Sequence, residues 1–268
     1  MSSPSVPLTG LLSDVAAWMP VTDGESGAVV LRHVSGDRFA KVVSRADAGM
    51  LGAERDRIEW LSSTGLPGPA VLDWCTTEYG ACLITSAVDG IPADRLDPAR
   101  LAQAWPSITD TLRRLHSIPT GTCPYSRTLE KMMALARATV AENRVHPEFL
   151  PLHLVDTSPA VILDSLERDL PRHAEREEAD AVVCHGDFCL PNVLIGPDTS
   201  LVTGLIDLGR LGRADPYADI ALLLANAREI WPDEDTARRA DDDFASWYGI
   251  ALDPARLDFY LRLDPLTW

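Results

Sequence analysis

The stretch that decides the fold is VVCHGDFCLPN, which runs from Val182 to Asn192. A short apolar run, typical of a buried strand, ends in His-Gly-Asp, and Asn192 follows Asp187 by five positions. Twenty residues after Asp187, in LIDLGR, Asp207 follows a second apolar run. Polar side chains directly after buried strands lie in loops, where they are free to contact a ligand.

These three side chains match the needs of phosphoryl transfer from a nucleotide to an alcohol. That reaction needs a carboxylate that orients the hydroxyl and accepts its proton, and oxygen ligands that hold Mg²⁺ on the phosphates. Asp187 can serve as the base, and Asn192 and Asp207 can bind the metal. Asn192 could instead cap the turn after Pro191, but its spacing from Asp187 favours the metal role. His185 is interpreted as a hydrogen-bonded core residue.

The N-terminal third of the sequence predicts a small sheet with one helix. Residues 27–34 and 37–43 form a predicted hairpin around Ser35-Gly36, residues 48–65 show helical spacing, and residues 69–75 and 80–88 are strand candidates. Lys41 lies in the second hairpin strand and Glu54 in the helix. A lysine on an edge strand often serves solubility alone. A pair with Glu54 would instead direct its ammonium group at phosphates.

The remainder of the chain is mainly helical in pattern. Helices are predicted over 101–118, 128–144 and 158–170, and two short strands over 181–187 and 202–209 precede further helices. The change from strand to helix pattern predicts an α+β protein of two lobes. The first comprises residues 1–88 with a hinge near 85–90, and the second comprises residues 89–268.

Composition restricts the classes of partner. The chain has 268 residues, with 24 basic and 40 acidic side chains and a formal net charge of −16. This charge repels nucleic acids and anionic membrane surfaces, so neither is an expected partner. It would attract a small cation, although solubility alone could explain it. The acidic stretch 233–243 is interpreted as solvated helix faces.

The expected location is the cytoplasm. No Lys or Arg precedes Arg32, so the charged start of a secretory signal is missing, and no apolar run is long enough to cross a bilayer. Five cysteines, an odd number, favour reduced thiols over a disulfide framework. Zinc binding by Cys184, His185 and Cys189 is disfavoured because no second Cys/His pair lies nearby in the sequence.

HGDFCLPN, followed by IDLGR and ADPYADIALLL, resembles the aminoglycoside phosphotransferase family, whose members are relatives of the protein kinases. The resemblance implies a two-lobed protein-kinase-like fold, with a small N-terminal β-sheet lobe and a larger, mainly helical C-terminal lobe. It implies ATP and Mg²⁺ as cofactors. It also implies Asp187 as the catalytic base, Asn192 and Asp207 as metal ligands, Lys41 paired with Glu54 on the nucleotide phosphates, Arg210 in catalysis on the substrate side, and Asp219 as a brace for the catalytic loop.

Further contacts with the nucleotide are expected from the same resemblance and from the pattern of the first lobe. The loop before the first strand would approach the phosphates at Ser26 and Gly27, because glycines there permit close backbone approach. The backbone groups of Thr85 and Ala87 at the hinge would bind adenine.

Within the family, GESG, ERDRIEWL, HSIPTGTCPYSR and FYLRLDPLTW are most similar to the streptomycin 3''-phosphotransferase branch. The tail RLDPLTW keeps Asp264 but has Pro265 where the kanamycin and neomycin 3'-enzymes have a glutamate. The resemblance therefore implies ATP-dependent O-phosphorylation of the 3''-hydroxyl of streptomycin, which inactivates the antibiotic. The expected contacts to this cationic aminoglycoside come from Asp187, Arg210, Glu229 and Asp264.

Two other functions stay open at this point. The chain could be a kinase for a different aminoglycoside, for choline or for a sugar, with the same nucleotide site. It could also be a non-catalytic nucleotide-binding module, although the joint presence of Lys41, Asp187, Asn192 and Asp207 argues against a degenerate site. A monomer is the expected oligomeric state.

Overall fold

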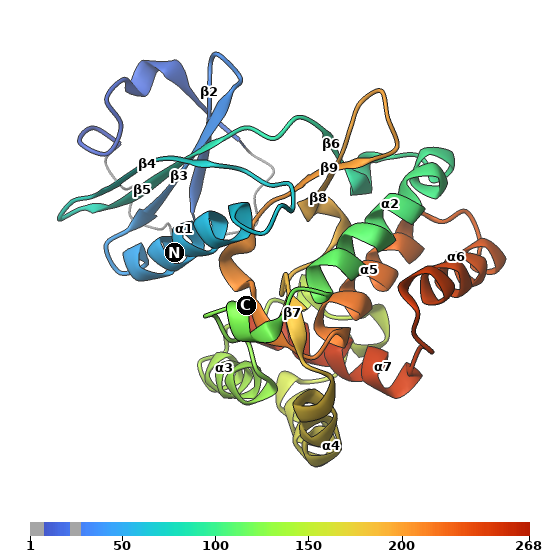
Figure 1. Ribbon diagram of the computed structural model, residues 1–268. Helices are drawn as coiled ribbons and strands as arrows, with labels where there is room; N and C mark the ends of the chain where they lie inside the picture. Colours follow the sequence, from blue (N-terminus) through green and yellow to red (C-terminus); the bar gives the residue numbers. More distant parts are fainter. Residues whose placement is uncertain (1–7, 22–27) are drawn as a thin grey trace.

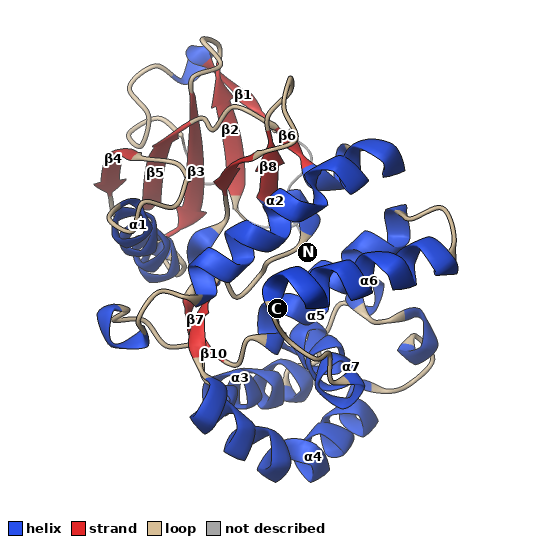
Figure 2. Ribbon diagram, turned by 45° about the vertical axis from the view of Figure 1, so that its right-hand side comes forward, coloured by secondary structure: helices blue, strands red, loops and turns tan. Residues whose placement is uncertain are grey.

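The computed structural model describes residues 8–21 and 28–268 of the chain. The first part is a five-stranded antiparallel sheet in the order β1-β2-β3-β5-β4, with helix α1 packed against one side (Figures 1 and 2). Its elements are β1 (Trp18–Pro20), β2 (Val29–His33), β3 (Arg38–Ser44), α1 (Ala48–Ser62), β4 (Val71–Thr76) and β5 (Gly80–Ser86).

The alternation of side chains along β3 determines which face of the sheet carries Lys41. Successive strand residues point to opposite faces. Ala40 and Val42 are buried in a small cluster on one face, whereas Val43 belongs to the large core that includes α1. Lys41 shares the side of Val43, so its ammonium group extends toward α1. The hairpin turns at Gly36, with φ of +77°, and α1 ends before Gly65, with φ of +78°. Both the predicted turn and the predicted helix end are therefore confirmed.

The second part of the chain is mainly helical. It contains α2 (Pro98–His116), α3 (Leu129–Ala141), α4 (Pro159–Asp180), α5 (Tyr217–Ile230), α6 (Glu234–Tyr248) and α7 (Pro254–Leu263). Two small sheets lie among them. One pairs β10 (Gly212–Ala214) with β7 (Val182–Cys184), and the other has the order β6 (Ile91–Pro92), β8 (Val193–Ile195), β9 (Val202–Leu205).

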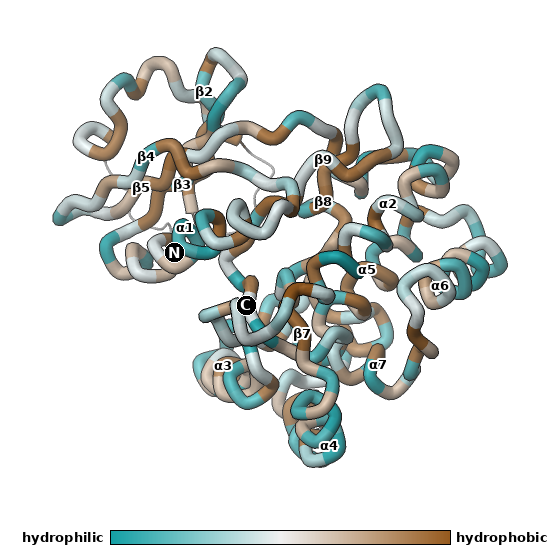
Figure 3. Tube along the Cα trace, in the orientation of Figure 1, coloured by the Kyte–Doolittle hydropathy of each residue, from teal (hydrophilic) through white to brown (hydrophobic). Residues whose placement is uncertain are grey.

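One hydrophobic core connects the sheet part to the helical part. Ile58 and Leu61 of α1 belong to the same buried cluster as Leu205, as Ile108 of α2 and as Leu223 of α5. A second cluster lies among α3, α4 and α7. Figure 3 shows the corresponding pattern, with hydrophobic residues on β3 and β5 and mainly hydrophilic ones along the outer helices α4 and α6. The two parts are therefore joined by packing, and the loops that carry polar side chains lie at their junction.

Several boundaries differ from the predicted ones, and two of them matter here. Helix α4 continues to Asp180, ten residues beyond the predicted end at Leu170, and contains Pro171. The strand β9 ends at Leu205, so Asp207 stands in the loop that follows, with a left-handed φ of 60°. Among the described residues, no helix is long and apolar enough to span a membrane.

All five cysteines carry free thiols. Cys82, Cys123 and Cys184 are buried, and Cys75 and Cys189 are partly buried. Burial raises the pKa of each thiol above its usual value. This finding agrees with the prediction of reduced thiols.

Candidate active site

A lysine held between two carboxylates connects the sheet part to the helical part. Lys41 Nζ donates to Glu54 Oε2 at 2.8 Å and to Asp207 Oδ1 at 3.2 Å. Burial alone would lower the pKa of Lys41, but the two carboxylates outweigh burial and raise the pKa above its usual value. Burial raises the pKa of Glu54, and the Lys41 ammonium opposes that effect. The predicted pair is thus present, and Asp207 extends it to three members.

The loop that carries the expected catalytic base, called the catalytic loop below, follows β7 and is fixed by a buried carboxylate on α5. Asp219 accepts hydrogen bonds from the backbone N–H groups of His185 and Gly186, both at 2.7 Å, and from His116 Nε2 at 3.1 Å. Burial would raise the pKa of Asp219, but these hydrogen bonds and the nearby histidines hold it below its usual value. Asp219 therefore holds the backbone of His185 and Gly186, the two residues that directly precede Asp187.

Gly186 is required by the local geometry of this loop. Its φ is +82°, and a Cβ at this position would lie 2.3 Å from the carbonyl oxygen of Arg210 and 2.8 Å from Cδ of Arg127. Only glycine satisfies both the backbone angle and the close approach. The His-Gly-Asp triplet thus has a structural reason for its middle residue.

Asp187 and Asn192 contact each other directly. Asn192 Nδ2 donates to the Asp187 backbone carbonyl and to Asp187 Oδ2, both at 3.0 Å, and lies 3.1 Å from Cys189 Sγ. Ile206 N–H donates to the Asn192 carbonyl at 3.0 Å, and His185 Nε2 lies 3.0 Å from the Ile206 carbonyl. Both backbone groups of Ile206 therefore attach the catalytic loop to the segment that carries Asp207.

The environment of Asp187 raises its affinity for a proton. Burial and the nearby carboxylate of Asp264 raise the pKa of Asp187 to about 6, against the opposing effect of Arg210. A carboxylate with this pKa is still ionised at neutral pH, yet it is a stronger base than an exposed aspartate. This property suits a group that accepts a proton from an alcohol.

The donor set at the junction fits a magnesium ion. Asn192 uses its amide nitrogen toward Asp187, which leaves Oδ1 as the atom available to a cation. The Asp207 side chain is 43% exposed, so its carboxylate is accessible. Carboxylate and amide oxygens are the ligands that Mg²⁺ prefers. His116, Cys184 and Asp219 also lie close together, but their polar atoms are buried and already hydrogen-bonded: His116 to Asp219, Asp219 to the catalytic loop, and Cys184 to the Asp215 carbonyl.

The carboxylate of Asp264 contacts three other side chains of the protein. Its Oδ1 lies 3.2 Å from Arg210 Nη1 and 3.7 Å from Arg127 Nη2, and its Oδ2 accepts from Trp268 Nε1 at 3.0 Å. The guanidinium of Arg210 also stacks on the Trp268 ring, with Cζ 3.4 Å from the ring centroid. Arg210 is near enough to Asp187 to oppose the rise in its pKa. Both oxygens of the Asp264 carboxylate are already used inside the protein, and contact of Arg210 and Asp264 with a substrate stays a prediction.

Arg127 is a residue of this site that sequence reasoning missed. Its side chain packs against Gly186, donates to Thr267 Oγ1 at 3.3 Å and contacts Asp264. Burial and the neighbouring Arg210 lower its pKa to about 10, so the guanidinium stays charged at neutral pH. It lies before α3 and sixty residues from Asp187, so no spacing in the sequence links the two.

The other predicted site residues have varied positions. Glu229 is exposed on α5, one turn beyond Asn226, whose side chain accepts from the Leu190 N–H in the catalytic segment. Thr85 pairs with Phe39 and Val71 inside the sheet. The Ala87 N–H donates to the Asp37 carbonyl at 2.8 Å, and contact of these two backbone segments with adenine stays a prediction. Ser26 and Gly27 lie outside the described residues.

Comparison with known proteins agrees with this geometry. The sequence matches the family described as the phosphotransferase enzyme family over residues 17–260. A streptomycin 3''-kinase of Streptomyces griseus is 56% identical over 251 residues, covering 94% of this chain and 92% of that protein. An aminoglycoside 3'-phosphotransferase of Streptomyces fradiae is 37% identical, covering 92% of this chain and 94% of that protein.

Solved structures show the same relationship. The aminoglycoside phosphotransferase APH(3'')-Id of Streptomyces rimosus, in complex with ADP and streptomycin, superposes with a TM-score of 0.93 at 49% identity, covering 97% of this chain and 98% of that chain. An aminoglycoside 3'-phosphotransferase of type VIII gives a TM-score of 0.78 at 35% identity, with 93% of each chain covered. The expected two-lobed, kinase-like α+β fold is confirmed. The chain therefore belongs to the phosphotransferase enzyme family, among its aminoglycoside phosphotransferases.

Proposed function

We propose that this protein transfers the γ-phosphoryl group of ATP to the 3''-hydroxyl of streptomycin. The observation that carries the proposal is the gathering of Lys41, Glu54, Asp187, Asn192 and Asp207 at one junction. Support for the substrate comes from two relatives: the Streptomyces griseus protein is a streptomycin 3''-kinase, and the Streptomyces rimosus enzyme was solved with ADP and streptomycin.

In this mechanism Asp187 orients the hydroxyl and accepts its proton as the phosphoryl group arrives. The hydrogen bond from Asn192 Nδ2 fixes one carboxylate oxygen, which leaves the other for the alcohol. Lys41, aimed by Glu54, steadies the nucleotide phosphates. Asn192 and Asp207 would hold Mg²⁺, which neutralises charge on the phosphates when it is bound. Most of the catalysis is then positioning and electrostatic stabilisation.

The nucleotide would lie between the sheet part and the helical part. We place the division between the lobes at residues 1–88 and 89–268, with the hinge near residues 85–90. Because the Ala87 N–H is used by Asp37 and Thr85 pairs with strands on both sides, the Ala87 carbonyl, which lies just beyond β5, is the better candidate for contact with adenine.

Streptomycin carries two guanidinium groups, which pair well with carboxylates through two parallel hydrogen bonds each. Glu229 is exposed on α5, three residues after Asn226, which contacts the catalytic segment at Leu190, whereas the Asp264 oxygens are occupied by Arg210, Arg127 and Trp268. We therefore assign guanidinium binding to Glu229 and an organising role to Asp264. Glu229→Gln should raise the KM for streptomycin about tenfold and leave the KM for ATP unchanged.

The decisive experiment is a substrate panel of streptomycin, kanamycin, hygromycin and choline with ATP, followed by coupled detection of ADP. Turnover with streptomycin, and phosphate at the 3'' position by NMR of the product, would support the proposal. ADP release with another compound of the panel, but not with streptomycin, would refute it. Asp187→Asn should abolish turnover and keep nucleotide binding, whereas retained turnover would contradict its role as the base.

The product explains the biological effect. A phosphate adds about two negative charges to the drug at neutral pH, so a binding site built for a cation would no longer accept it. This is the basis of antibiotic resistance. The cytoplasm supplies ATP and keeps thiols reduced, so the proposed reaction and the five free thiols favour it as the location. We expect a monomer.

A further inference from the structure

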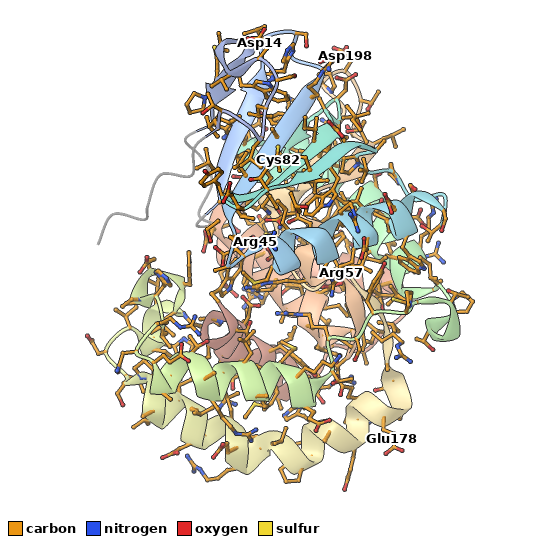
Figure 4. All side chains as sticks on the ribbon, turned by 90° about the vertical axis from the view of Figure 1, so that its left-hand side faces the viewer. Asp14, Arg45, Arg57, Cys82, Glu178 and Asp198 are labelled. Carbon is orange, nitrogen blue, oxygen red and sulfur yellow. The ribbon has the colours of Figure 1, made fainter. Side chains whose placement is uncertain are left out.

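One face of α1 is attached to the helical part by hydrogen bonds that the proposed reaction does not use. Arg57 Nε donates to the Leu211 carbonyl at 2.7 Å, and Trp60 Nε1 donates to the Thr122 carbonyl at 3.1 Å. In the reverse direction, Tyr125 OH donates to the Asp56 carbonyl at 2.8 Å. Figure 4 shows Arg57 on the side of α1 that faces the helical part.

Arg57 is the most strongly held of these side chains. Besides the bond to Leu211, its Nη1 donates to the Ala53 carbonyl in its own helix at 2.8 Å, and its guanidinium lies over the Tyr125 ring, with Cζ 4.8 Å from the centroid. Burial lowers the pKa of Arg57 from its usual value. Hydrogen bonds to charged groups contribute more than neutral ones. The contact is therefore specific in direction, because it depends on the position of one carbonyl.

The carbonyl that Arg57 binds belongs to the turn that carries Asp207. Leu211 closes the short 3₁₀ turn Leu208–Arg210, which follows Asp207 directly, and its N–H donates to the Leu208 carbonyl at 3.1 Å. One helical turn before Arg57, Glu54 holds Lys41, which contacts Asp207 itself. Helix α1 thus contacts both ends of the same turn: at its start through Glu54, which holds the β3 residue Lys41 against Asp207, and at its end through Arg57.

Two attachments along one helix fix its rotation as well as its position. With the Leu211 contact in place, Glu54 is presented to Lys41, and the turn packs closely against it: a Cβ at Gly209 would lie 3.7 Å from Glu54 Oε2. We propose that Arg57 is a positioning residue that docks α1 on the Asp207 turn and thereby sets the Lys41–Glu54 pair for nucleotide binding. The proposal rests on the proposed ATP-dependent reaction for the identity of the nucleotide.

The test compares two neighbouring arginines of α1. Arg57→Met removes the guanidinium and keeps most of the aliphatic stem. Arg55→Met is the matched control, because Arg55 pairs with Asp56 and lies over Trp74, away from the Asp207 turn. We expect Arg57→Met to weaken ADP binding about tenfold, the effect of one lost charged hydrogen bond, and Arg55→Met to change it less than twofold. Calorimetry with Mg²⁺ and ADP measures both without streptomycin.

A double-mutant cycle with Glu54→Gln then asks whether Arg57 acts through the pair. If it does, Arg57→Met should cost much less in the Glu54→Gln background than in the wild type. Fully additive losses would overturn the proposal, and so would a lower melting temperature of Arg57→Met with unchanged ADP affinity, which is the result of a merely structural role. The KM for streptomycin should stay within twofold. Absence of streptomycin turnover in the wild type would refute the substrate assignment alone, because ADP binding tests Arg57 independently.

Discussion

Replacement of Asp219 by asparagine tests whether a buried carboxylate holds the catalytic loop. The wild-type side chain is fully buried and accepts two backbone N–H groups, from His185 and Gly186, at 2.7 Å each, plus His116. Asparagine has the same shape but only one acceptor oxygen. Its NH₂ group would therefore face one of these N–H donors, and two donors cannot form a hydrogen bond with each other.

The expected cost follows from these contacts. One charge-assisted hydrogen bond is lost, which is worth about 1.5–3 kcal/mol, and one buried N–H is left without a partner, which costs about 1–3 kcal/mol. We expect the free energy of unfolding to fall by about 3–5 kcal/mol, a large share of the about 5–15 kcal/mol of a typical protein. The kcat should fall as well, because Asp187 follows directly after the loosened segment.

The pH dependence of this loss has a defined sign. The folded-state pKa of Asp219 lies below its unfolded value, so its stabilising effect is complete above the unfolded pKa, near 4, and is lost as the pH falls through the folded pKa. Because the two backbone N–H donors do not titrate, a large difference between wild type and Asp219→Asn should persist from pH 6 to pH 9. Urea denaturation at several pH values in that range measures it.

The control is Asp243→Asn, an exposed position on α6, which should change the free energy of unfolding by less than about 0.5 kcal/mol. The reasoning would be refuted if Asp219→Asn lost less than about 1 kcal/mol, or if its loss vanished at pH 9.

Three further outcomes follow from the site. Because the pKa of Asp187 is about 6, kcat/KM for streptomycin should fall as the pH drops below 6, and a flat profile from pH 4.5 to 8 would contradict the base role. Gly186→Ala should destabilise the protein by more than about 3 kcal/mol, because its Cβ would lie 2.3 Å from a carbonyl oxygen; Gly249→Ala, also at positive φ but with open space, should cost only about 1 kcal/mol in thermal or urea unfolding. Lys41→Met should weaken ADP binding at least about tenfold, since the cation aimed by Glu54 is lost, and unchanged affinity in calorimetry would refute its phosphate role.

The sequence predicted those elements whose signals are local. Ser35-Gly36 indicated the first hairpin, and Gly65 indicated the end of α1, because both positions need a backbone that glycine adopts easily. The three-residue strand Val193–Ile195 gave no detectable alternation, and its partner β6 has two residues, one of them a proline. Such short pairings form only because the surrounding core fixes them.

The residues of the site likewise include some that the sequence could predict and some that it could not. The spacing of Asp187, Asn192 and Asp207 was visible in one sequence segment, and the structure brings them together. The contacts of Arg127 with Gly186 and with Asp264 depend on three distant segments that meet only in the folded chain. Likewise, the sequence showed that Asp264 is acidic but not that its oxygens are occupied internally.

The five free thiols are buried or half-buried, so their rates of chemical modification can report local opening of the folded protein. A protonated, enclosed thiol reacts slowly with an alkylating reagent, so the buried cysteines are modified only when their surroundings separate, and the partly buried Cys75 and Cys189 react earlier. Cys82 reports on the sheet, Cys184 on the strand before the catalytic loop, and Cys189 on the loop itself. The order in which mass spectrometry finds them modified would therefore rank these regions by the ease with which each one opens.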